Sequence, residues 1–87
     1  MQIDPKEMAR VVNRLKRTQG QVGGILRMLE EGRTCEDIIT QLAAVSRALD
    51  RTGFGLTASG LRQCLAESGG NETMETLKLE RVFLSLA

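Results

Sequence analysis

Apolar residues recur at helical spacing along two long stretches of this 87-residue chain. The spacing predicts one helix from about residue 5 to 31 and a second from about residue 35 to 67, followed by a short third helix from about residue 72 to 86. At ~1.5 Å per residue the two long helices reach about 40 Å or more, whereas a compact globule of this length has a radius of gyration of about 12 Å. We therefore expect the chain to bury its apolar surface by forming oligomers.

Composition favours a single all-α domain spanning residues 1–87. Hydrophobic residues make up 41% of the chain, but its only aromatic residues are Phe54 and Phe83, and strand-type alternation is absent. Asp4 and Pro5 suit a helix start, and Thr34 suits the start of the second helix. The glycines within residues 53–60 leave an alternative open, in which the second helix breaks and a hairpin brings the two cysteines together.

The residue inventory excludes several functional classes. The chain contains no histidine, so it lacks the usual general base, and no carboxylate pair marks an obvious catalytic cleft. We expect that it is not an enzyme. Without a signal peptide or a run of about 18 apolar residues, the expected location is the cytoplasm, with no membrane partner.

Two cysteines, Cys35 and Cys64, lie 29 positions apart. At ~100° per residue this separation is eight turns plus ~20°, so both thiols share one helical face but lie ~43 Å apart along the axis. They cannot form a disulfide within one straight helix. In a symmetric antiparallel dimer, Cys35 of each chain would face Cys64 of the other.

The predicted thiol pair has several possible roles. Cys35 lies in the first turn of the second helix, where free N–H groups favour a thiolate, so we expect Cys35 to attack and Cys64 to resolve. The alternatives are two buried small hydrophobic residues or a Cu(I) site, since Cu(I) accepts soft thiolates. Zn²⁺ is less well supported, because two further ligands would be needed without histidine.

Basic residues form two groups. Arg10, Arg14 and Arg17 follow the i, i+4, i+7 spacing of one helical ridge, and Arg47 and Arg51 form a pair on the second helix. One interpretation is an ordinary solvated face. The other is contact with the phosphates of double-stranded DNA.

Several motifs in register resemble the CsoR/RcnR family of small bacterial repressors that sense metals or reactive sulfur. Residues 14–25 read RLKRTQGQVGGI and are similar to the family signature RL-R-x-x-GQ-V-x-G-I. RTCEDI at residues 33–38, TQLAAV at 40–45 and LRQC at 61–64 resemble its cysteine-bearing and adjacent stretches. The resemblance covers roughly residues 8–66.

The resemblance implies a three-helix protomer, an antiparallel dimer that forms a four-helix bundle, and a disc-shaped tetramer made of two dimers. Such proteins bind operator DNA without inducer and release it when the site between subunits is occupied. The DNA-binding residues of the family map onto Arg14, Lys16 and Arg17. The family's arginine after AAV is Ser46 here, with Arg47 beside it.

Departures from the family pattern suggest a subclass. Copper sensors of the family place a histidine one turn before the second cysteine, where this chain has Gly60, and its nickel, cobalt and formaldehyde sensors also use histidines. The remaining dithiol pair resembles the CstR-like branch, which senses persulfides through di-, tri- or tetrasulfide crosslinks and needs no cofactor. We therefore predict a persulfide- or polysulfide-sensing repressor acting through Cys35 and Cys64. The alternatives are a Cu(I) sensor that uses two thiolates, a thiol-dependent sulfur carrier and a purely structural oligomer.

Overall fold

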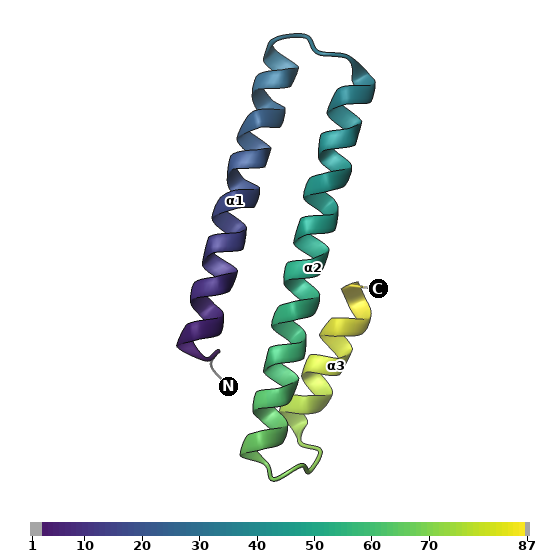
Figure 1. Cartoon of the computed structure of the whole chain (residues 1–87). Helices are drawn as coiled ribbons and strands as arrows, with labels where there is room; N and C mark the ends of the chain where they lie inside the picture. The colour runs from purple at the N-terminus through teal and green to yellow at the C-terminus, as the bar shows by residue number, and fades with distance from the viewer. Residues whose placement is uncertain (1–2, 87) are drawn as a thin grey trace.

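The computed structural model describes residues 3–86, and within them the chain is all-α, as predicted. Helix α1 spans Pro5–Glu30, α2 spans Cys35–Glu67 and α3 spans Met74–Leu86. Figure 1 shows α1 and α2 as an antiparallel hairpin, with α3 turning back along the C-terminal half of α2. Helix α2 packs against both of its neighbours.

Side chains at the helix ends explain where the first two helices begin. The Asp4 carboxylate accepts a hydrogen bond from the Lys6 amide, and Pro5 occupies the first turn of α1. The Thr34 hydroxyl accepts a hydrogen bond from the Asp37 amide at 3.3 Å and caps α2. Both caps agree with the sequence pattern.

Helix α2 continues through its glycines without a break. The alternative hairpin that would bring the cysteines together is therefore wrong. Helix α3 starts two residues later than expected, because Thr73 acts as its cap: the Thr73 hydroxyl accepts from the Thr76 amide at 3.3 Å. The Asn71 side chain instead donates to the Ser68 carbonyl at the end of α2.

The protomer is a thin, elongated layer. Its extents are 55 × 25 × 12 Å and its radius of gyration is 16.8 Å, well above the value of about 12 Å for a compact globule of this length. The smallest extent is close to the diameter of one helix. The buried hydrophobic residues in the described part are only Ile25, Val45 and Cys64, so the isolated protomer has a very small core.

The apolar stripe of α1 divides between two directions. Every seventh residue, Val11, Thr18 and Ile25, is buried or half-buried toward α2. The others remain exposed and form, with two leucines of α2, what we call the apolar face: Met8, Val12, Leu15, Val22, Leu26, Leu29, Leu42 and Leu49. The two α2 leucines lie ~40–60° to one side of Val45, and the antiparallel course of the helices turns that side the same way as the α1 residues.

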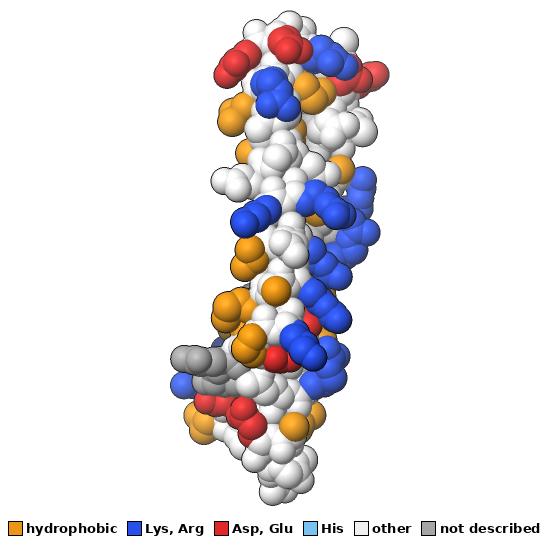
Figure 2. Space-filling model, turned by 60° about the vertical axis from the view of Figure 1, so that its left-hand side comes forward, with side chains coloured by type: hydrophobic (Ala, Val, Ile, Leu, Met, Phe, Trp, Pro, Cys, Tyr) orange, Lys and Arg blue, Asp and Glu red, His pale blue; other side chains and the backbone are white. Residues whose placement is uncertain are grey.

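Basic and hydrophobic side chains separate across the layer. Figure 2 shows most of the blue basic side chains along one side of the molecule and most of the orange hydrophobic ones along the other. None of the helices in residues 3–86 combines the length and hydropathy needed to cross a lipid bilayer.

Candidate nucleic-acid interface and thiol site

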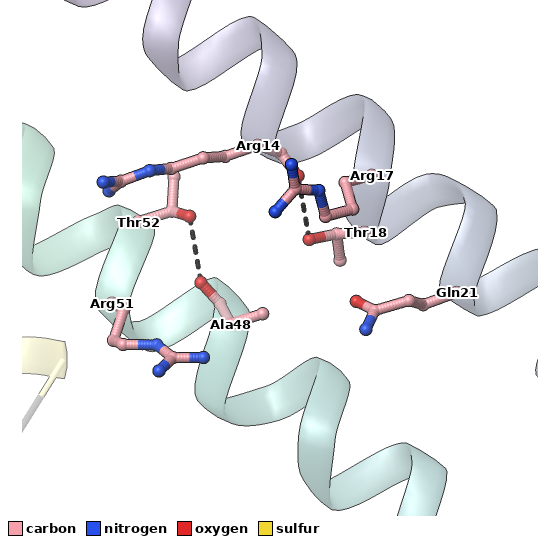
Figure 3. Close-up of a pocket in the computed structure, with 7 residues that line it drawn as sticks. All are labelled: Arg14, Arg17, Thr18, Gln21, Ala48, Arg51 and Thr52. Atoms are coloured by element: carbon pink, nitrogen blue, oxygen red, sulfur yellow. Dashed lines mark hydrogen bonds between the residues drawn. The ribbon is translucent and has the colours of Figure 1, made fainter.

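A groove between α1 and α2 gathers three arginines. Arg14 and Arg17 reach it from α1, and Arg51 reaches it from α2 (Figure 3). Its remaining lining residues are Thr18, Gln21, Ala48 and Thr52. The tertiary structure therefore brings together members of the two basic groups that the sequence placed on separate helices.

Two buried threonines, one from each helix, lie at this groove. The Thr18 hydroxyl donates to the Arg14 carbonyl at 3.0 Å, and the Thr52 hydroxyl donates to the Ala48 carbonyl at 2.9 Å (Figure 3). Because each hydroxyl is satisfied within its own helix, the helices can approach without an unpaired polar group. Within residues 3–86, none of the three groove arginines forms an ion pair with a carboxylate. The groove thus presents uncompensated positive charge.

The other predicted DNA-binding residues lie outside the groove. Lys16 is exposed, and at ~100° per residue it lies ~200° around α1 from Arg14. Arg47 is exposed one turn before Arg51 but does not line the groove. Gln21, which sequence reasoning missed, follows Arg14 and Arg17 at positions i+7 and i+4, and this spacing was a usable signal.

The two thiols lie in contrasting environments near opposite ends of α2. Cys35 is the first residue of the helix and is exposed, with the Arg33–Asp37 ion pair of 3.4 Å beside it in the sequence. Cys64 is only 2% exposed. Neither cysteine forms a disulfide within the described residues, and the unbroken helix separates them by ~43 Å at ~1.5 Å per residue. One protomer therefore does not bring the pair together.

Helix α3 supplies a partner for Cys64 that sequence reasoning missed. The Cys64 Sγ donates to Glu75 Oε2 at 3.6 Å. Burial raises the pKa of the Cys64 thiol, and the hydrogen bond to Glu75 and the negative charges of Glu75 and Glu67 raise it further. No spacing in the sequence indicates this contact, because it forms across the turn between α2 and α3.

The donor set of a single protomer is too small for a metal site. Among residues 3–86, no group of three or more His, Cys, Asp or Glu side chains lies close enough to hold a metal ion. Two thiolates contributed by two chains would be a soft, low-coordinate donor set, which fits Cu(I). Any such site requires a second subunit.

Comparison with known proteins identifies the family. The family model described as "Metal-sensitive transcriptional repressor" matches residues 7–83. The copper-sensing transcriptional repressor CsoR of Bacillus subtilis (strain 168) is 40% identical over 63 residues, which are 72% of this chain and 62% of that protein. The copper-sensing repressor RicR of Mycobacterium tuberculosis (strain ATCC 25618 / H37Rv) is 42% identical over 55 residues, which are 63% of this chain and 57% of that protein.

The match spans less than two thirds of the length of each of these relatives, both of which are named as repressors rather than enzymes. No solved structure matches the chain. The family model nevertheless covers nearly the whole helical part, including both cysteines and the groove arginines. The chain therefore belongs to the CsoR family of metal-sensitive transcriptional repressors.

Proposed function

We propose that this protein is a DNA-binding transcriptional repressor whose affinity for its operator is controlled by its two thiols. The observation that carries the proposal is the position of Arg14, Arg17 and Arg51 around one groove between α1 and α2. Guanidinium groups with no carboxylate partner are suited to phosphate contacts. The names of the relatives support the same function.

The assembly we propose is an antiparallel dimer joined through the apolar face, with two dimers forming a tetramer. Support comes from the exposed leucines and valines of that face and from the small core of the protomer. In such a dimer, Cys35 of one chain would meet Cys64 of the other, and the basic grooves would remain on the outside.

Two effectors are candidates, each supported by a different observation. Cu(I) is supported by the names of the relatives, which are copper-sensing repressors. Bound Cu(I) would be held by Cys35 and Cys64 of two subunits, and its contribution would be to link two helices that the effector-free dimer leaves independent.

Reactive sulfur is supported by the residues of this chain, which has no histidine and has Gly60 one turn before Cys64. A sulfane sulfur donor, RS–SH, would transfer sulfur to the Cys35 thiolate and leave as a thiolate. The Cys64 thiolate of the other subunit would then attack the inner sulfur of the Cys35 persulfide. An S–S bond would form between the subunits, and hydrosulfide would leave with the outer sulfur reduced.

The test of DNA binding starts from operator fragments selected from genomic DNA by the protein itself. Fluorescence anisotropy with such a fragment is then followed during titration with Cu(I) and, separately, with a polysulfide donor. Release of DNA by Cu(I) at one equivalent per thiol pair supports Cu(I) as the effector. Release of DNA by the donor, with a crosslinked dimer in non-reducing mass spectrometry, supports reactive sulfur as the effector.

Mixed subunits test whether the thiol pair forms between chains. Cys35→Ala and Cys64→Ala proteins each lack one member of every pair, but a mixed dimer retains one Cys35–Cys64 pair. We expect donor-induced crosslinking of this pair only in the mixture. If both single variants, tested separately, still release DNA when either effector is added, control of DNA binding by a thiol pair would be contradicted. Failure of any selected fragment to bind would contradict the repressor function.

A further inference from the structure

Helix α3 covers the Cys64 side of α2. The side of α3 that faces α2 includes Thr76, which is 4% exposed, and Phe83, which lies about two turns further along the helix. The Phe83 ring meets the Phe54 ring of α2 edge-to-face, with 5.1 Å between centroids. This aromatic contact anchors the C-terminal part of α3 on α2.

The first turn of α3 lies over the thiol itself. Glu75 accepts the hydrogen bond of the Cys64 thiol at 3.6 Å. An open hollow beside this contact is lined by Cys64, the end of α2 and the start of α3. The thiol therefore lies at the edge of the α2–α3 contact while its own surface is almost fully covered.

Modification of Cys64 conflicts with this arrangement. The thiol of a cysteine residue that is only 2% exposed cannot meet a cysteine from another subunit unless the covering atoms move. A sulfur bound to Cu(I) or to another sulfur has also lost its proton and can no longer donate to Glu75. The contact is thus specific to the unmodified thiol.

The connection between α2 and α3 contains two glycines, the residue type with the widest range of allowed backbone conformations. Gly69 and Gly70 adopt φ values of +67° and +89°, which cost glycine little. Helix α3 contacts only α2 among the described helices and is 13 residues long. Opening it would therefore leave the α1–α2 contact intact.

We propose that α3 is a lid over Cys64, held closed by Phe83 against Phe54, and that it must swing away from the end of α2 before the thiol can react. The use of this lid in sensing rests on the function proposed above, whereas the shielding of the thiol does not. In an assembled repressor the position of α3 would then depend on whether Cys64 is modified, because the closed position requires the unmodified thiol.

Alkylation rates measure the lid directly, and Cys35 serves as the reference in the same chain. The full-length protein is treated with iodoacetamide at one pH, and both cysteine peptides are quantified by mass spectrometry over time. We expect Cys64 to react at least ~10-fold more slowly than Cys35, since a closed lid multiplies the intrinsic rate by the open fraction. Equal rates in the wild-type protein would overturn the proposal.

Substitutions at Phe83 identify α3 as the shield without altering any charge near Cys64. We expect Phe83→Ala to raise the Cys64 rate by ~10-fold or more, and Phe83→Leu to raise it less, because leucine retains part of the contact. Leu84→Ala is the matched control, since Leu84 is 70% exposed on the same helix. The Cys35 rate and the circular dichroism signal show whether the rest of the chain stays folded.

Equal Cys64 rates in Phe83→Ala and Leu84→Ala would refute the lid. If the shielding follows the prediction but neither Cu(I) nor a polysulfide donor changes DNA binding, the lid stands and the proposed function fails.

Discussion

The apolar face allows a quantitative prediction about assembly. Leu26 remains 55% exposed in the protomer. Because full burial of a leucine side chain is worth about 1.5–3 kcal/mol, burying the exposed half at an interface is worth ~1 kcal/mol per chain. A symmetric dimer contains the residue twice, so Leu26→Ala should cost ~2 kcal/mol, which raises the dimer dissociation constant ~30-fold.

Sedimentation equilibrium over a range of protein concentrations measures this constant. Alanine is the better helix former, so α1 itself should not be weakened by the substitution. Leu84→Ala removes the same atoms from a more exposed leucine outside the apolar face and should leave dimer dissociation unchanged. A Leu26→Ala dissociation constant indistinguishable from that of Leu84→Ala would refute the assignment of this face as the dimer interface.

Three further predictions follow from individual residues. Arg51→Ala should reduce the slope of log affinity against log salt concentration by about 0.9 per lost phosphate contact. Lys16→Ala should leave the slope unchanged, because Lys16 lies outside the groove. Equal slopes for the two variants in fluorescence anisotropy titrations would contradict the groove as the DNA-binding site. Gly32→Ala should lower the free energy of unfolding by about 1–2 kcal/mol, because Gly32 has a φ of +72°. Gly20→Ala within α1 should raise it by about 1 kcal/mol, since nothing lies within 4 Å of the added Cβ. Denaturant unfolding curves that rank the two variants the other way would contradict this. The raised pKa of Cys64 means that the folded state keeps a proton which the unfolded state loses, so stability should fall as pH rises above the ordinary thiol pKa. In thermal melts at pH 7 and 10, Cys64→Ser should lose less stability between the two pH values than the wild-type protein. An identical loss in the two proteins would argue against the pKa shift.

Local signals were sufficient to predict most of the helical architecture. Capping residues such as Asp4 and Thr34 act within one turn, and the apolar period extends over many turns, so both are readable from neighbouring positions. The continuity of α2 through its glycines followed from the same period. The start of α3 was misplaced because Asn71 and Thr73 are both good capping residues, and only the bonds they form distinguish them.

The candidate site was only partly predictable. The two thiols and the groove arginines were identified from residue type and spacing, but spacing on separate helices does not show which arginines meet. That Arg14, Arg17 and Arg51 share a groove, while Lys16 points elsewhere, depends on how α1 and α2 rotate about their axes when they pack.

The sequence alone determined that this chain forms long helices, with two thiols on one face and too little core for an isolated protomer. These properties depend on the regular geometry of the helix, which repeats identically from turn to turn. Only the tertiary structure decided that Cys64 is covered and lies beside Glu75. That contact depends on the direction in which the chain leaves the turn after α2, and no periodic pattern encodes a direction in space.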